Sequence, residues 1–136
     1  MTTFALKIVT PDGLKYDGQA EKVILRTVTG DMAVLAGHIN CVAPLGMGQA
    51  TFVIDGQKRY AACIGGILSV VKGEVHVVAT TFEWAEEIDI DRAAVAEQKA
   101  RTVLDGKGTA DEDLRMAEAK LKRALIRKNV AGHMPK

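Results

Sequence analysis

The sequence predicts an antiparallel β-sandwich followed by an antiparallel two-helix hairpin, and three observations lead to this fold class. Apolar side chains alternate with period two up to about residue 82, which is typical of strands that bury one face. Turn residues interrupt the alternation at short intervals, and no helical crossover separates the strands, so an antiparallel sheet is expected. After Trp84 the apolar period changes to between three and four. We therefore expect two domains, residues 1–84 and residues 85–136.

Turn chemistry bounds the expected strands of the first domain. Phe4, Leu6 and Ile8 point to one face of a first strand, which ends at the turn residues 10–13. The remaining strand candidates are residues 22–28, 50–54, 58–64, 67–71 and 75–79.

Two turns in this domain predict hairpins. Asp55-Gly56 separates two strand candidates, and both residue types tolerate the positive φ angles of a type I′ turn. Lys72-Gly73-Glu74 joins the last two strands in a second hairpin. Gly65-Gly66 marks a bend or a close approach of two backbones.

The second domain begins where alanine replaces β-branched residues. Asp89 or Asp91 is expected to cap a first helix that stops at Gly106, and Asp111 to cap a second. The apolar stripes predicted by helical spacing are Ala93, Ala96, Ala100, Val103 and Leu104 in the first helix and Leu114, Ala117, Leu121, Ala124 and Leu125 in the second. Alanine buries little area, at roughly 25 cal/mol for each Å². The hairpin is therefore expected to be held shut weakly, which suits an element that changes shape.

Composition excludes several classes of function. The 136 residues carry 18 Lys and Arg against 17 Asp and Glu, so no overall field attracts nucleic acid or an anionic membrane. Only 4% of the residues are aromatic, which disfavours an RNA-binding barrel that stacks bases. No apolar run approaches the roughly 20 residues that span a bilayer. We expect a protein that is cytosolic or peripheral to a membrane, without direct membrane insertion.

The sequence offers no catalytic motif. A phosphate-binding glycine loop, an HExxH zinc motif and a GxSxG elbow are all absent, so we expect no enzymatic activity, no metal and no required cofactor. Cys41 and Cys63 lack metal-ligand spacing and are interpreted as small apolar residues. His38 lies close to Cys41, but no third group is identified that would orient a nucleophile.

Basic residues near the end of the second helix have two interpretations. Lys120, Lys122, Arg123, Arg127 and Lys128 can be a solvated helix end that the macrodipole favours. Alternatively they form an anion site. Arg123 and Arg127 share a helix face, as do Arg92 and Lys99 on the first helix. An antiparallel hairpin brings Arg92 towards Arg123 and Arg127, an arrangement of like charges that an anion would stabilise.

Several short stretches of the sequence are informative together, through their order and spacing rather than singly. They are Ile8-Val9-Thr10-Pro11-Asp12-Gly13, Tyr16, Ala20-Glu21, Gly30-Asp31-Met32-Ala33-Val34-Leu35-Ala36-Gly37-His38, Leu45-Gly46, Gly65-Gly66-Ile67-Leu68 and Ala85-Glu86-Glu87-Ile88-Asp89. In these stretches, and over its whole length, the chain resembles the epsilon subunit of bacterial F-type ATP synthase.

The resemblance implies a ten-stranded sandwich and a role in a rotor. Family members are non-catalytic central-stalk subunits that link the gamma subunit to the membrane ring during proton-driven ATP synthesis. By similarity the segment 31–44 faces that ring, which gives Asp31 and His38 an interface role. The hairpin of many members extends, meets the alpha and beta subunits and blocks ATP hydrolysis. The implied location is the cytoplasmic face of the bacterial membrane.

A subset of the family binds ATP on the closed hairpin through an I/L-D-x-x-R-A motif, which residues 88–93 match in full. By similarity Glu83 and Asp89 would contact the adenine or ribose, and Ile88 and Ala93 would pack near the base. The phosphates would be held by Arg92, Arg123 and Arg127. Lys99 stands where nucleotide-binding relatives carry arginine, so it keeps the charge but loses the planar fork. ATP is thus the expected regulatory ligand.

Two alternatives remain open at this stage. Asp89 can be a helix cap and nothing more. The whole chain can be a stand-alone small-ligand-binding sandwich with a helical oligomerisation tail, which would form a stable homo-oligomer.

Overall fold

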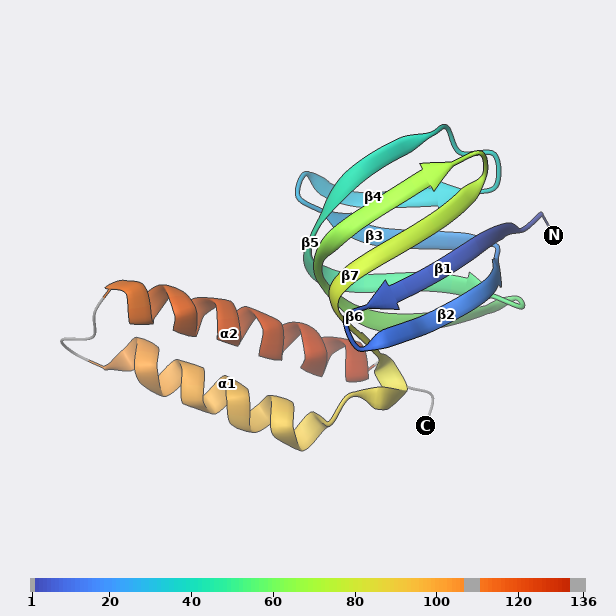
Figure 1. Ribbon diagram of the computed structural model, residues 1–136. Coiled ribbons are helices and arrows are strands. Elements are labelled where there is room, and N and C mark those ends of the chain that lie inside the picture. The colour runs from blue at the N-terminus through green and yellow to red at the C-terminus, as the bar shows by residue number, and fades with distance from the viewer. Residues whose placement is uncertain (1, 107–110, 133–136) are drawn as a thin grey trace. The chain divides into compact units, whose positions relative to one another are not determined.

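The computed structural model describes residues 2–106 and 111–132, and the chain divides into two compact units. The first is Met1–Trp84, called here the sandwich, and the second is Ala85–Lys136, called the hairpin. Figure 1 shows the strands in the first unit and the helices in the second. The unit boundary lies where the apolar period of the sequence changes.

The sandwich is built from one seven-stranded sheet with the order β2-β1-β7-β6-β5-β3-β4. Its strands are β1 (Phe4–Thr10), β2 (Gly13–Ala20), β3 (Lys22–Thr27), β4 (Gly30–Leu35), β5 (Cys41–Ile54), β6 (Gln57–Val71) and β7 (Glu74–Trp84). Five of the six neighbouring pairs in the sheet are antiparallel, but β1 and β7 pair in parallel, with Leu6 opposite Val75 and Val9 opposite Val78. The expected fully antiparallel sheet is therefore wrong at this pair. A parallel pair needs a long connection, and the five intervening strands supply it without a helix.

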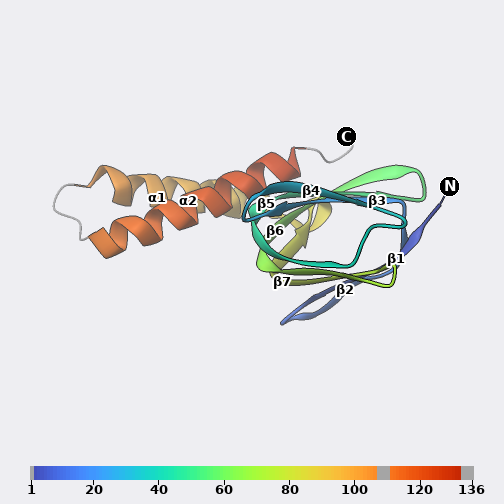
Figure 2. The same cartoon turned by 90° about the horizontal axis from the view of Figure 1, so that it is seen from above.

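The described residues form seven strands and not the ten that the family resemblance implied. The difference lies in β5, β6 and β7, which are 14, 15 and 11 residues long. Their cross-strand pairing skips Gly46, Gly65 and Thr80, so each strand bends without ending. Figure 2 shows the sheet folding around its interior, with β3, β4 and β5 on one side and β1, β2 and β7 on the other. The three bent strands continue from one layer to the other, so each counts as one strand. Counting each of them as two would give ten.

Both predicted hairpins are confirmed in position, and the type I′ geometry predicted for Asp55-Gly56 is confirmed as well. Asp55 and Gly56 have φ angles of 53° and 74°, and Ile54 pairs with Gln57. Lys72 and Gly73 have φ angles of 50° and 79° in the second turn. Positive φ at both central residues is the type I′ geometry, whose twist matches that of the strands it joins.

The core fills the space between the two layers with alternating inward side chains. Phe52, Phe82 and Trp84 pack edge-to-face, with ring centroids 5.0–5.8 Å apart. The Trp84 indole also lies under the Arg59 guanidinium at 3.8 Å and donates to the Lys15 carbonyl at 3.4 Å. Trp84 therefore has aromatic, cationic and hydrogen-bonding partners within the sandwich.

Gly66 is required where the bent strands approach one another. It has φ +119°, and a Cβ at this position would overlap the carbonyl oxygen of Val78 and the Cα of Ala79. We expect Gly66→Ala to lower the free energy of unfolding by about 3 kcal/mol or more, because it adds a backbone clash to a strained φ. Gly73→Ala is the matched control, since Gly73 has φ +79° and open space around it. Its expected cost is about 1 kcal/mol. Urea unfolding of both variants measures the difference, and equal losses would contradict the close approach.

The hairpin contains a 3₁₀ turn, η1 (Ala85–Glu87), and the helices α1 (Ile90–Asp105) and α2 (Asp111–Ala131). Figure 1 shows α1 and α2 side by side and antiparallel. The buried helix residues are Ala93, Ala100, Ala117, Ala124, Val130 and Ala131. Val103 and Leu125 are each 39% exposed, so the stripe predicted from spacing is too broad at these positions. None of the described helices is long and apolar enough to cross a membrane.

Candidate functional site

The start of α1 explains much of the motif at residues 88–93. The Asp89 carboxylate accepts a hydrogen bond from the Arg92 backbone N–H at 3.0 Å, and the Asp89 carbonyl accepts one from Ala93. Asp89 has extended backbone angles, so it is the N-cap and Ile90 is the first helical residue. Of the two expected cap candidates, Asp89 is therefore the one that caps the helix, and a contact with a ligand would be an additional role.

Ile88 and Ala93 also have a structural role in this motif. They are 7% and 3% exposed. Ile88 directly precedes the N-cap and Ala93 is the fourth helical residue, which are the positions of a hydrophobic staple. Arg92, in contrast, is exposed. The side chains of the other motif residues named from the resemblance contribute to the start of the helix. The Arg92 side chain does not, because only its backbone N–H is used there.

One edge of the hairpin is identified by an ion pair. The Lys128 ammonium donates to both carboxylate oxygens of Glu97, at 3.0 and 3.5 Å. Each partner follows a buried alanine by four residues, Glu97 following Ala93 and Lys128 following Ala124. A residue four positions after a buried alanine is rotated about 40° around the helix axis from that alanine, in the direction of the helical winding. Because the two helices are antiparallel, this rotation brings Glu97 and Lys128 to the same edge of the hairpin.

The predicted phosphate-binding residues lie towards the other edge. Arg92, Lys99 and Arg123 each directly precede a buried alanine. They are therefore rotated about 100° around the helix axis from the seam, in the direction opposite to that of Glu97 and Lys128. Arg127 follows Ala124 by three residues and turns the same way. We call these four residues, Arg92, Lys99, Arg123 and Arg127, the arginine edge.

The Glu97–Lys128 contact also sets the level of each residue along the hairpin. Arg92 precedes Glu97 by five residues, so on α2 it is level with a position five residues after Lys128. At 1.5 Å per residue, Arg92 lies roughly 9 Å along the axis from Arg127 and roughly 15 Å from Arg123. Arg92 is thus closer to Arg127 than to Arg123, which the sequence alone did not distinguish.

Lys99 lies nearer to the second-helix arginines than Arg92 does. It follows Glu97 by two residues and is therefore level with a position between Arg123 and Arg127. Arg123 and Arg127 are half-buried, and the Arg123 Nε donates to the Ala119 carbonyl at 3.4 Å. Four cations within about three helical turns suit an elongated polyanion better than a single small anion.

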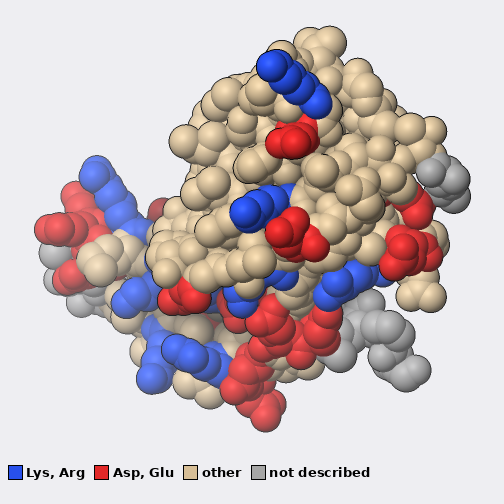
Figure 3. Space-filling model, turned by 45° about the vertical axis from the view of Figure 1, so that its right-hand side comes forward, with Lys and Arg blue, Asp and Glu red and all other residues tan. Residues whose placement is uncertain are grey.

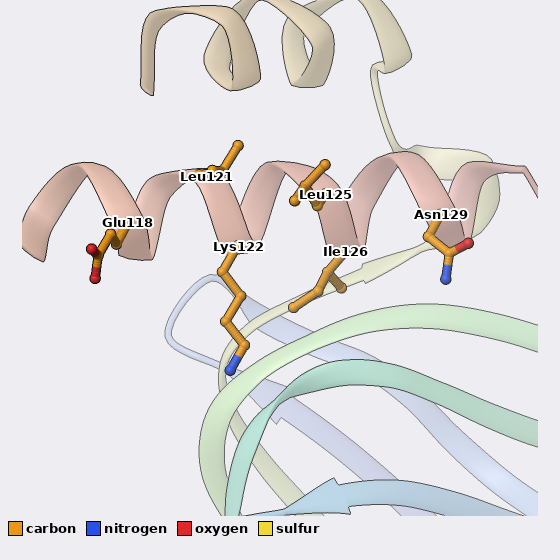
Figure 4. A pocket seen from close by; sticks show the side chains of 6 residues that line it. All are labelled: Glu118, Leu121, Lys122, Leu125, Ile126 and Asn129. Atoms are coloured by element: carbon orange, nitrogen blue, oxygen red, sulfur yellow. The ribbon is translucent and has the colours of Figure 1, made fainter. Parts of the chain in front are cut away.

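A hollow on α2 is separate from the arginine edge. It is lined by Glu118, Leu121, Lys122, Leu125, Ile126 and Asn129. Figure 4 shows Leu121 and Leu125 projecting to the side of α2 that faces α1, while Lys122 and Ile126 project to the opposite side. No residue predicted to bind a ligand lines this hollow.

Glu83, the remaining predicted nucleotide contact, belongs to the sandwich. It is half-buried on β7 and pairs with Ala62 of β6. Its neighbour Trp84 is 6% exposed and packs within the sandwich core.

The two predicted interface residues lie in the β3–β5 region of the sandwich. Asp31 forms an ion pair with Arg26, its cross-strand partner, at 3.1 Å, and its side chain remains 58% exposed. His38 lies in the segment between β4 and β5, where its Nδ1 is 2.8 Å from the Ile39 carbonyl. Because that carbonyl can only accept, it fixes Nδ1 as the protonated nitrogen.

The structure gives no support for a cysteine nucleophile. The Sγ of Cys41 lies 4.0 Å from His38 Nδ1, the nitrogen already directed at a carbonyl. Burial raises the pKa of the Cys63 thiol to about 12, so Cys63 is inert near neutral pH. Among residues 2–106 and 111–132 no group of His, Cys, Asp and Glu side chains is arranged to hold a metal ion.

An outward-facing apolar surface was missed by the sequence reasoning. Cross-strand pairing places Pro44 opposite Ile67, Ile67 opposite Val78, and Val78 opposite Val9. The row continues at its ends to Leu14 and Val28, through the Val9–Leu14 pair and a hydrogen bond from Val28 N to Pro44 O. We call Val28, Pro44, Ile67, Val78, Val9 and Leu14 the outer row. Its signal in the sequence is the unbroken apolar runs around Ile67 and Val78, where inward and outward positions are both apolar.

The outer row is exposed across five strands and one turn. Val28, Leu14, Val78 and Ile67 are 65%, 57%, 55% and 50% exposed. Figure 3 shows few Lys, Arg, Asp and Glu side chains on the upper part of the face in view, and those present lie in neighbouring groups of opposite charge. A continuous exposed apolar patch of this kind is typical of a protein–protein interface.

The matches to known proteins cover nearly all of both units. Residues 3–85 match the family model described as ATP synthase, Delta/Epsilon chain, beta-sandwich domain, and residues 86–132 match ATP synthase, Delta/Epsilon chain, long alpha-helix domain. The chain is 44% identical to the ATP synthase epsilon chain of Bacillus velezensis, over 98% of this chain and 100% of that one. It is 43% identical to that of Bacillus subtilis, over 97% and 99%.

Solved structures with a similar fold come from mitochondrial ATP synthases. A chain in the cryo-EM structure of the Euglena gracilis enzyme, OSCP/F1/c-ring, superposes with a TM-score of 0.82 at 23% identity, over 95% of this chain and 81% of that one. A chain of the Tetrahymena thermophila central stalk/c-ring structure gives 0.61 at 10% identity, over 93% and 95%. At these identities the two matches support the fold.

Proposed function

The chain belongs to the family of ATP synthase epsilon chains, non-catalytic stalk subunits, and we propose that its two units divide the work of such a subunit. In this proposal the sandwich docks on the gamma subunit and the membrane ring during proton-driven ATP synthesis. The hairpin regulates ATP hydrolysis. The observation that carries the proposal is the match to epsilon chains at up to 44% identity across both units, which leaves neither unit without a counterpart.

The outer row supports docking of the sandwich on a protein partner. Its side chains form a row in register across the sheet and are about half exposed. Burying such a row against a complementary apolar surface stabilises a complex at roughly 25 cal/mol per Å². We assign the part of the row that lies outside segment 31–44 to the gamma subunit, namely Val28, Ile67, Val78, Val9 and Leu14.

The loop between β4 and β5 supports docking on the membrane ring. Ile39, which follows His38 in the loop, is 78% exposed, and Val42 near the start of β5 is 68% exposed. Asp31 presents a charge at the start of β4. In this arrangement the subunit lies peripherally at the cytoplasmic face of the bacterial membrane, and the ring contacts segment 31–44.

The narrow alanine seam supports a hairpin that opens. Ala93 and Ala100 on α1, and Ala117, Ala124 and Ala131 on α2, repeat every seven residues. Such a seam permits close approach but buries little apolar area, so opening costs less than separating leucine-rich helices. The extended hairpin would contact the alpha and beta subunits and block hydrolysis. ATP held on the arginine edge would favour the closed form by mass action, without being a required cofactor.

Truncation after residue 84 tests the division of labour. The sandwich has its own core and its own complete sheet, so we expect the 1–84 fragment to fold. It should assemble into the ATP synthase like the full chain, and ATP hydrolysis by the assembled enzyme should rise because the inhibitory element is missing. Hydrolysis rates of the two enzymes, with equal subunit content verified by gel, measure this. An unfolded fragment, or equal inhibition by both chains, would overturn the proposal.

A further inference from the structure

The closed hairpin has little apolar contact to hold it when no ligand is bound. The buried residues that α1 contributes are both alanines, Ala93 and Ala100. Across the seam Ala117, Ala124 and Ala131 are likewise small, and Val130 is the larger buried side chain of α2. Bringing the arginine edge together adds repulsion between like charges. A polar contact across the seam would therefore add to closure in the ligand-free chain.

Glu97 makes a direct polar contact between the two helices. Its side chain is only 15% exposed, and Lys128 lies 3.0 Å away on α2. Arg101, one turn further along α1, contacts the same carboxylate at 3.5 Å. The hydrogen bond from Lys128 lowers the pKa of Glu97, with a smaller contribution from Arg101. The carboxylate therefore stays charged and paired near neutral pH.

We propose that the Glu97–Lys128 pair is a latch that holds the hairpin closed in the absence of a ligand. The pair crosses the seam, so it must break when α1 and α2 separate, whereas the Glu97–Arg101 pair lies within α1 and survives opening. The latch lies on the edge opposite the arginine edge. A nucleotide and the latch can therefore act together, each holding one edge.

This inference rests on the proposed function only for its regulatory meaning, since closure can be measured in the isolated full-length chain. Spin labels on Asp91→Cys and Asn129→Cys, at exposed positions of α1 and α2, report the distance between the open ends of the helices. Cys41 is replaced by Ser in all variants. Cys63 stays, because burial makes its thiol unreactive.

Without ATP, we expect Lys128→Gln and Glu97→Gln each to raise the ratio of open to closed hairpins on the order of fivefold. Open hairpins give long distances between the two spin labels, and closed hairpins give short ones. Arg101→Gln is the matched control, since it removes an ion pair from the same carboxylate without crossing the seam. Glu118→Gln controls for loss of an exposed acid. Both controls should keep the original distances. A charge swap, Glu97→Lys together with Lys128→Glu, should restore the short distance that either half of the swap loses by itself. The swap is made in the Arg101→Gln background, so that Arg101 does not lie beside the new lysine.

Circular dichroism of each variant verifies that both helices remain formed. Unchanged distances in Lys128→Gln and Glu97→Gln would overturn the latch, and so would equal opening by Arg101→Gln. These results do not depend on ATP. A chain that never binds ATP but opens when Glu97 loses its partner would contradict the nucleotide site and support the latch.

Discussion

Ile67→Asp is expected to abolish stable binding of the chain to the gamma subunit. Ile67 lies in the middle of the outer row, between Pro44 and Val78, and half of its surface is exposed. An aspartate there would be buried in the complex without a partner, which costs several kcal/mol. The expected loss of affinity is on the order of 100-fold. Titration of purified gamma subunit against the variant measures the change.

The free chain should tolerate this substitution, because Ile67 points away from the sandwich core. An unchanged melting temperature checks that the variant is folded. Val95→Asp is the control, as Val95 is similarly exposed at 54% but lies on α1. It should bind gamma like the original chain. Undiminished binding by Ile67→Asp would show that the gamma subunit uses another face of the sandwich.

Arg92→Ala is expected to weaken ATP binding by the hairpin on the order of 30-fold or more. Arg92 is the exposed residue of the motif whose side chain the helix start does not require. A guanidinium bound to phosphate makes charge-assisted hydrogen bonds, each worth about 1.5–3 kcal/mol. Titration calorimetry with ATP measures the loss. Arg115→Ala, an exposed arginine near the start of α2, should bind ATP normally.

Absence of ATP binding by the unaltered chain at millimolar concentration would remove this site. Equal affinities of Arg92→Ala and the unaltered chain would leave the motif as a helix start alone.

Two substitutions at Asp89 separate its cap from a contact with nucleotide. Asn caps a helix about as well as Asp, so Asp89→Asn should leave hairpin stability unchanged. Asp89→Ala should destabilise the hairpin by about 1 kcal/mol. If the carboxylate also binds the nucleotide, as the family resemblance implies, Asp89→Asn will lower ATP affinity while the thermal unfolding of the helices stays the same. Equal ATP affinity would assign Asp89 to the cap alone.

Local chemistry was sufficient to predict the turns and the helix start. Asp55-Gly56 tolerates positive φ and has such angles in the structure, and the second predicted turn, at Lys72-Gly73, has them too. Asp89 was one of two cap candidates, and the structure selects it because Ile88 and Ala93 are then both buried. Each of these features depends on a few neighbouring residues, so the sequence contains the information directly.

The strand count and one pairing could not be predicted in this way. No strand was expected at β4 (Gly30–Leu35), where inward Val34 is flanked by exposed residues in a short edge strand. The parallel partnership of β1 with β7 joins residues about 70 positions apart. Periodicity identifies strands but carries no information about which distant strands will be neighbours.

The sequence by itself determined where the chain divides, where its hairpins turn and which residues carry charge on each helix. Only the tertiary structure decided which side chains meet. It aligned Val9, Pro44, Ile67 and Val78 into one row, because sheet register brings residues from four strands to one line. It also paired Glu97 with Lys128 and turned Arg92 to the other edge, because helix phase and the level of packing are set jointly by both helices. Such relations belong to pairs of elements, and the sequence of either element alone does not contain them.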